Sequence, residues 1–137
     1  MISPVGSMEI RTDSKGAGYF GAPRGWRLHQ GIDIVAEVGS EICAPEDGKI
    51  IRVMFPYGKQ EAMRGIILKA KQIIHKLTYV ELLSSDLVGT YVKEGAPIGR
   101  LQDIRDKYGA GIIPHIHWET IVNPVFVIDN LKTSLPI

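Results

Sequence analysis

The sequence has few of the features that mark a disulfide-rich, membrane-spanning or nucleic-acid-binding protein. It contains one cysteine, Cys43, and so can form no internal disulfide. Lysine and arginine (16) nearly balance aspartate and glutamate (15), and only 7% of residues are aromatic, which argues against a basic nucleic-acid-binding surface. No apolar run approaches the roughly 20 residues that span a bilayer. We therefore expect no nucleic-acid partner and no membrane span.

The sequence also has few features of an exported protein or of an enzyme with a catalytic cysteine. Residues 1–12 have neither a basic n-region nor an apolar h-region, so we expect no signal peptide. The thiol of Cys43 has no basic neighbour in "EICAPE", which favours a small buried side chain over a catalytic nucleophile. The length of 137 residues suits one ordinary domain, and we expect a single domain over residues 1–137 with its core at about 9–130.

Helical periodicity is nearly absent, and short runs rich in β-branched residues recur instead. Glycine- and proline-containing turns separate these runs at intervals of about ten residues. The pattern is typical of a mainly β fold: an antiparallel β-sheet or sandwich-like hybrid barrel of short strands, with at most short helices. The expected strands lie within residues 31–37, 47–55, 64–71, 72–82 and 115–122, and short helices are expected within 103–109 and 123–131.

Two histidines, His115 and His117, stand one residue apart in the strand-like run "IPHIHWE". Side chains alternate along a strand, so these two imidazoles project from the same face. Much earlier, "HQGID" places His29 four residues before Asp33. Imidazoles and a carboxylate suit zinc, and three protein ligands leave one coordination position for water. Each fragment alone is more often structural, but together they favour a catalytic metal site.

The sequence resembles the lysostaphin/LytM-type zinc metallopeptidases, a family of bacterial peptidoglycan endopeptidases, in "HQGIDI", "GSEICAPEDGKI", "VKEGAPIGRL" and "PHIHWE". Its opening, "EIRTDSKGAGYFGAPRG", is similar to the leukocyte cell-derived chemotaxin branch of the same fold, which keeps the zinc ligands but is not regarded as a working peptidase. The resemblance implies Zn²⁺ ligands at His29, Asp33 and His117, and it places His115 beside the water that zinc binds.

The family's second active-site histidine falls on Glu81, in "TYVELL". Three roles are open to this residue: a general base, a protonated hydrogen-bond donor, or a side chain that points elsewhere. A charged carboxylate beside a developing oxyanion opposes reaction by ~4 kcal/mol, at about 4 Å and an effective dielectric of about 20. We predict His115 and Glu81 as the catalytic candidates. Glu119 is expected to orient a ligand imidazole, and His75 is expected to be exposed or paired.

Two functions follow from the resemblance. The first is a zinc-dependent endopeptidase that hydrolyses peptide cross-links of peptidoglycan, with His115 as base or stabiliser, at the bacterial cell wall or in a phage particle or lysis system. The alternative is a catalytically silent, zinc-retaining module that binds peptidoglycan peptide or another peptide ligand, because Glu81 replaces the second histidine. The sequence indicates no oligomeric state.

Overall fold

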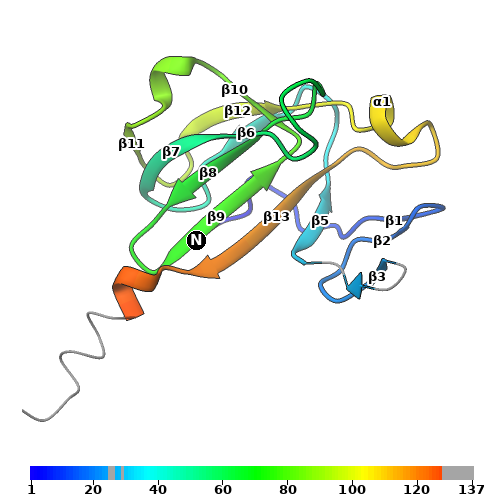
Figure 1. Ribbon diagram of the computed structural model, residues 1–137, viewed down its shortest axis with the longest axis horizontal. Helices are drawn as coiled ribbons and strands as arrows, with labels where there is room; N and C mark the ends of the chain where they lie inside the picture. The colour runs from blue at the N-terminus through cyan, green and yellow to red at the C-terminus, as the bar shows by residue number, and fades with distance from the viewer. Residues whose placement is uncertain (25–26, 29, 128–137) are drawn as a thin grey trace, which may run out of the picture.

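The computed structural model describes residues 1–127 except 25, 26 and 29, and that part is built mainly from short strands (Figure 1). The strands are β1 (Thr12–Asp13), β2 (Gly16–Ala17), β3 (Pro23–Arg24), β4 (Arg27–Leu28), β5 (Ile32–Val35), β6 (Glu41–Cys43), β7 (Gly48–Met54), β8 (Gly65–Lys69), β9 (Ile73–Thr78), β10 (Val80–Leu82), β11 (Tyr91–Val92), β12 (Pro97–Leu101) and β13 (His115–Val122). Helical segments there are the 3₁₀ turn Ser85–Leu87, α1 (Arg105–Tyr108) and residues 124–127. None of the described helices has the length and apolar character to cross a bilayer.

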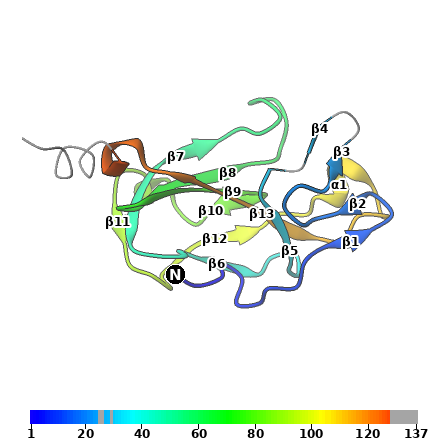
Figure 2. The same cartoon turned by 90° about the horizontal axis from the view of Figure 1, so that it is seen from below.

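Two antiparallel sheets form the body of the fold. The larger has the strand order β11-β7-β8-β9-β13-β5, and the smaller has the order β10-β12-β6. Figure 2 shows β6 and β12 in a layer beneath β8, β9 and β13. In the described part of the chain the larger sheet stays open, with β11 and β5 at its edges, and forms no closed barrel. The mainly β, sandwich-like fold class predicted from the sequence is confirmed.

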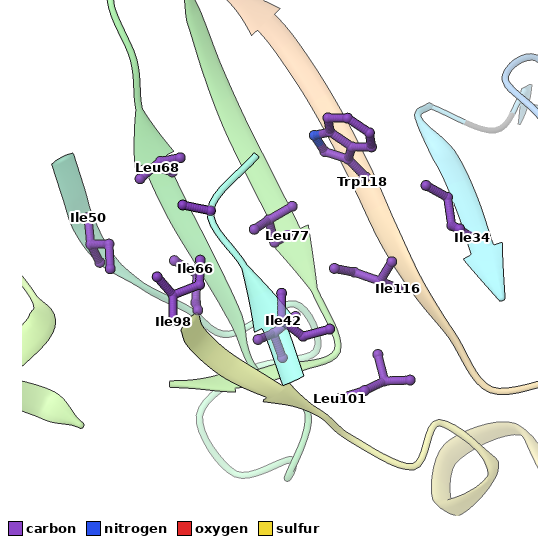
Figure 3. Close-up of a cluster of buried hydrophobic side chains, with 12 residues drawn as sticks. Ile34, Ile42, Ile50, Ile66, Leu68, Leu77, Ile98, Leu101, Ile116 and Trp118 are labelled. Atoms are coloured by element: carbon purple, nitrogen blue, oxygen red, sulfur yellow. The ribbon is translucent and has the colours of Figure 1, made fainter. Parts of the chain in front are cut away.

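Apolar side chains fill the space between the two sheets (Figure 3). On β13, the side chains of Ile116 and Trp118 pack in the core and are 0% and 8% exposed. Because successive strand residues point to opposite faces, this turns His115 and His117 to the other face of the sheet. The core therefore fixes which way the histidine pair points. Other members of the core are Ile34, Ile42, Ile50, Ile66, Leu68, Leu77, Val80, Ile98 and Leu101.

The predicted strand over residues 72–82 is wrong in one respect, because the structure divides it between β9 and β10 at Tyr79. Tyr79 has a φ of 72°, in the left-handed region that bulky side chains rarely adopt. This turn moves the chain from the larger sheet to the smaller one. The other four predicted runs each contain one strand, and α1 confirms the helical turn within 103–109. The predicted helix within 123–131 is present at 124–127, and its remainder lies outside the described residues.

His75 is completely buried and paired on both ring nitrogens. Its Nδ1 accepts the indole N–H of Trp118 at 3.0 Å, and its Nε2 lies 2.5 Å from Glu46 Oε2. Because an indole can only donate, Nδ1 is unprotonated and Nε2–H donates to the carboxylate. Burial lowers the pKa of His75, although Glu46 acts in the opposite direction. The ring thus joins the loop of Glu46 to the core side of β13.

We expect His75 to make the fold less stable in acid. Its pKa in the folded protein lies below the ordinary value of 6.5, so the unfolded chain binds the proton more strongly. The stability that the neutral His75 ring contributes to the fold is present above pH 6.5. It is lost as the pH falls from there toward the lowered pKa of His75. Melting temperatures measured from about one pH unit above the ordinary value of 6.5 to about one and a half units below it should fall more steeply for the unmodified protein than for His75→Gln. Parallel curves would contradict this expectation.

Candidate metal centre

Asp33 and His117 lie opposite each other on neighbouring strands. β5 pairs with β13 so that Asp33 faces His117, and the two residues are 84 positions apart in sequence. Opposed residues in an antiparallel pair present their side chains on one face. The core occupies the other face through Ile34 and Ile116. Strand register therefore brings the carboxylate and the imidazole to one point.

The imidazole of His117 lies between two carboxylates. Nδ1 is 2.7 Å from Asp33 Oδ1, and Nε2 is 2.9 Å from Glu119 Oε1. Burial acts to lower the pKa of His117, but the hydrogen bonds to Asp33 and Glu119 outweigh it and the pKa is raised. A metal that replaced the Nδ1 proton would leave Nε2–H donating to Glu119, which is a common arrangement of histidine ligands. The orienting role predicted for Glu119 agrees with this contact.

His115 lies on the same face, and the protein holds it as a neutral base. Its Nδ1 is 2.7 Å from the carbonyl oxygen of Ile113, so that Nδ1–H donates and Nε2 keeps its lone pair. Nε2 is directed toward Asp33, 3.6 Å from Oδ2. The side chain is 3% exposed, and burial lowers its pKa although Asp33 opposes this. An imidazole in this state can accept a proton at Nε2.

Gly31, in the "HQGID" motif, lets β5 and β13 approach each other. Its φ is 106°, in the region that favours glycine. A Cβ at this position would lie 2.7 Å from the Trp118 carbonyl oxygen and 3.1 Å from His117 Cε1. A larger residue would therefore displace β5 from β13 and separate Asp33 from His117.

A cavity of about 730 Å³ opens over this face, within the range of about 300–1,000 Å³ usual for ligand pockets. Three tyrosines line one side of it, from three separate segments: Tyr57, Tyr79 and Tyr108. The Tyr79 ring meets His115 edge-on at a centroid distance of 5.3 Å. The hydroxyl of Tyr57 lies 2.7 Å from that of Tyr79 and 2.7 Å from that of Tyr108. Burial raises the pKa of Tyr79 to about 12, so its hydroxyl stays neutral near pH 7.

The structure brings together three of the five predicted site residues: Asp33, His115 and His117 line the cavity. His29 lies outside the described residues. Glu81 is exposed on β10, opposite Arg100, and the described residues that line the cavity do not include it. Its catalytic role stays a prediction. From the same segment, Thr78 and Tyr79 line the cavity.

The donors that the structure describes fit zinc as part of a site. In a tetrahedral zinc site with bonds of about 2.0–2.2 Å, neighbouring donor atoms lie roughly 3.4 Å apart. Asp33 Oδ1 and His117 Nδ1 are 2.7 Å apart. The two side chains would therefore need to move only slightly apart to bind the ion between them. Among the described residues no group of three or more His, Cys, Asp and Glu side chains is placed to hold a metal. The third protein donor would be His29, which the motif predicts.

Sequence reasoning missed two residues that shape this site, Arg11 and Tyr79. Arg11 is 3% exposed and contacts Asp33 through Nε and Nη2, each 3.0 Å from Oδ2. A lone arginine in "EIRT" carries no motif that would single it out. Tyr79 precedes Glu81 by two residues, and only the left-handed turn shows that it enters the cavity.

Comparison with known proteins agrees with this geometry. The profile of peptidase family M23 matches residues 27–127, which is more than half of the chain. The chain belongs to peptidase family M23. Leukocyte cell-derived chemotaxin-2 from Bos taurus is 35% identical over 115 residues, covering 82% of this chain and 74% of the relative.

Two bacterial proteins extend the comparison. Lysostaphin from Staphylococcus staphylolyticus is 31% identical over 113 residues, which cover 80% of this chain and 22% of lysostaphin. A zinc containing peptidase from Vibrio cholerae has a crystal structure that aligns with a TM-score of 0.55 at 22% identity, covering 82% of this chain and 34% of that one. The latter match shows a shared fold. This chain thus spans only a minor part of either bacterial protein.

Proposed function

We propose that this domain is a zinc-dependent endopeptidase that hydrolyses the peptide cross-links of bacterial peptidoglycan. The observation that carries the proposal is the convergence of Asp33, His117 and His115 on one face of the sheet, beside a cavity large enough for a peptide segment. Family membership supports the reaction class, and the similarity to lysostaphin supports a cell-wall substrate. The site of action proposed is the bacterial cell wall or a phage particle or lysis system.

In this proposal Asp33 and His117 would hold zinc together with His29. A zinc ion bound there would supply Lewis-acid polarisation of a carbonyl and activation of a water. His115 is the group that would accept a proton at Nε2, since its Nδ1–H is committed to Ile113 and burial lowers the pKa of the ring. Glu119 keeps the His117 ring oriented through Nε2–H.

The second polar group of the proposed reaction is Tyr79. Its neutral hydroxyl, bonded to Tyr57, lies in the cavity and is suited to donate toward an oxyanion. We expect Tyr79→Phe to lower kcat by about tenfold or more, since loss of one such donor costs ~100- to 1,000-fold where it is fully used. Glu81→Gln serves as the control and should change kcat less than about twofold, because an exposed residue outside the cavity should matter little.

The measurement is release of free amines from purified peptidoglycan by the zinc-loaded variants. A large loss in Glu81→Gln with little change in Tyr79→Phe would instead support the catalytic role predicted for Glu81. Failure of the unmodified chain to release amines at all would remove the peptidase proposal.

A second candidate function is a zinc-retaining module that binds peptide without cleaving it. The similarity to chemotaxin-2 favours it, as does a cavity in which the described part of the chain supplies a tyrosine beside His115. Cleavage that appears only in Tyr79→His or Glu81→His would support this function. Cleavage by the unmodified chain would exclude it.

A further inference from the structure

The N-terminal hairpin of β1 and β2 lies against the metal centre, although it precedes the part of the chain matched by the family profile. Its backbone is joined to β5: Arg11 N–H donates to the Asp33 carbonyl at 2.8 Å, and Asp33 N–H donates to the Gly18 carbonyl at 2.7 Å. A Cβ on Gly18 would lie 2.5 Å from the Asp33 Cβ. The hairpin is therefore packed directly on the residue that bears the carboxylate.

Arg11 contacts one oxygen of the Asp33 carboxylate, and His117 contacts the other. The Nε and Nη2 atoms of Arg11 both contact Oδ2 at 3.0 Å, while Oδ1 faces His117 Nδ1 at 2.7 Å. Charge-assisted contacts between a guanidinium and a carboxylate oxygen are strong and directional. Because the guanidinium holds Oδ2, Oδ1 is the oxygen that faces the ligand imidazole of His117 and would face a metal bound there.

Asp13 holds Arg11 in place and extends the network to His115. Arg11 Nη1 donates to Asp13 Oδ1 at 2.8 Å and to the Gly16 carbonyl at 2.9 Å. Asp13 Oδ2 accepts the backbone N–H of Ile113 at 2.7 Å, and the carbonyl of Ile113 accepts Nδ1–H of His115. One chain of hydrogen bonds thus runs from the base to the carboxylate ligand through the hairpin.

We propose that Arg11 is a positioning residue of the metal centre, which holds Asp33 as a ligand through Oδ1 alone and is itself held by Asp13. The inference rests on the zinc site of the proposed function. It goes beyond that function by making the hairpin part of the site. A carboxylate that loses this partner is free to rotate and to offer both oxygens to the ion, which raises the coordination number.

Cobalt(II) is the probe, because four-coordinate cobalt absorbs visible light more strongly than five- or six-coordinate cobalt. Cobalt is titrated into the metal-free chain of 137 residues, and the spectrum and Kd are recorded. Arg11→Lys keeps the positive charge but cannot place two N–H donors of one planar group on Asp33 Oδ2. We expect it to weaken and shift the visible absorption, and to raise the Kd by about 10- to 100-fold, as loss of an outer hydrogen-bond partner does elsewhere.

Arg105→Lys is the matched control. Arg105 also contacts an aspartate, Asp103, through Nε and Nη2, with one nitrogen 2.8 Å from each carboxylate oxygen, but it lies on the surface and is not among the residues that line the cavity. It should give the spectrum and Kd of the unmodified chain. An Arg11→Lys spectrum like that of the unmodified chain, with a Kd within about twofold, would overturn the inference.

Should Arg11→Lys show no cooperative melt, Asp13→Asn takes its place. That variant leaves Arg11 in contact with Asp33 but weakens the contact between Asp13 and the Arg11 guanidinium. We expect the same spectral shift and a Kd for cobalt raised at least about threefold. A Kd unchanged in Asp13→Asn would overturn the inference. An unmodified chain that binds no cobalt overturns the metal site altogether, whereas one that binds cobalt but cleaves no peptidoglycan removes only the proposed hydrolysis.

Discussion

Zinc is expected to raise the melting temperature of the unmodified chain and to leave that of His117→Gln unchanged. Ligand binding to the folded state stabilises it by ~2.7 kcal/mol at a concentration of 100 times Kd. For a chain of this size that corresponds to a rise of about 10 °C. His117 supplies Nδ1 directly opposite Asp33 Oδ1, so its loss removes a donor and not merely an orienting contact. Thermal melts with and without zinc measure the difference.

The matched variant is His115→Gln, the same substitution two residues away on the same face of β13. His115 is held by the Ile113 carbonyl and is not one of the predicted ligands, so this variant should keep most of the zinc-dependent rise. Equal loss of the rise in the two variants would contradict the division of roles between the two histidines. An equal rise in both would mean that zinc binds elsewhere.

Hydrolysis of peptidoglycan is expected to fall by ~100- to 10,000-fold in His115→Gln, the range that a general base usually contributes. The physical reason is the neutral Nε2, which burial and the Nδ1–H bond to Ile113 keep available for a proton. Glutamine has no group that accepts a proton near pH 7. Amine release by zinc-loaded protein, measured at saturating substrate, gives the change in kcat.

His75→Gln provides the control for this loss, since His75 is a second buried histidine that lies on the core side of the sheet, bonded to Trp118 and Glu46. It should keep kcat within about threefold of the unmodified chain, because it touches none of the reacting groups. Full activity in His115→Gln at full zinc occupancy would show that another group takes the proton.

The sequence was sufficient to predict the fold class and most of the strands of the larger sheet. β-branched runs bounded by glycine turns predicted β5, β7, β8, β9 and β13, since burial on the core face follows the period of a strand. The same alternation predicted that His115 and His117 share a face. The bounds of the short strands β6, β11 and β12 could not be predicted. A strand of two to five residues beside Gly and Pro is too short to show a clear alternation of apolar and polar side chains.

The turn at Tyr79 could not be predicted, because a left-handed tyrosine contradicts local preference and is held by tertiary contacts. Periodicity therefore led to a continuous strand to Glu81. The charged partner of Asp33 could not be predicted from the sequence either. The pairing of Arg11 with Asp33 depends on the hairpin folding back across β5, and no spacing rule relates residues 22 positions apart in that way.

The proposed function requires that one zinc ion is held at Asp33 and His117, together with His29, beside the base His115. Diffraction from zinc-soaked crystals, recorded above and below the zinc absorption edge, locates the ion directly. We expect one strong anomalous peak at about 2.0–2.2 Å from Asp33 Oδ1 and His117 Nδ1, with Oδ2 still on Arg11. A peak located at other residues, or none at this site with zinc in excess, would contradict it.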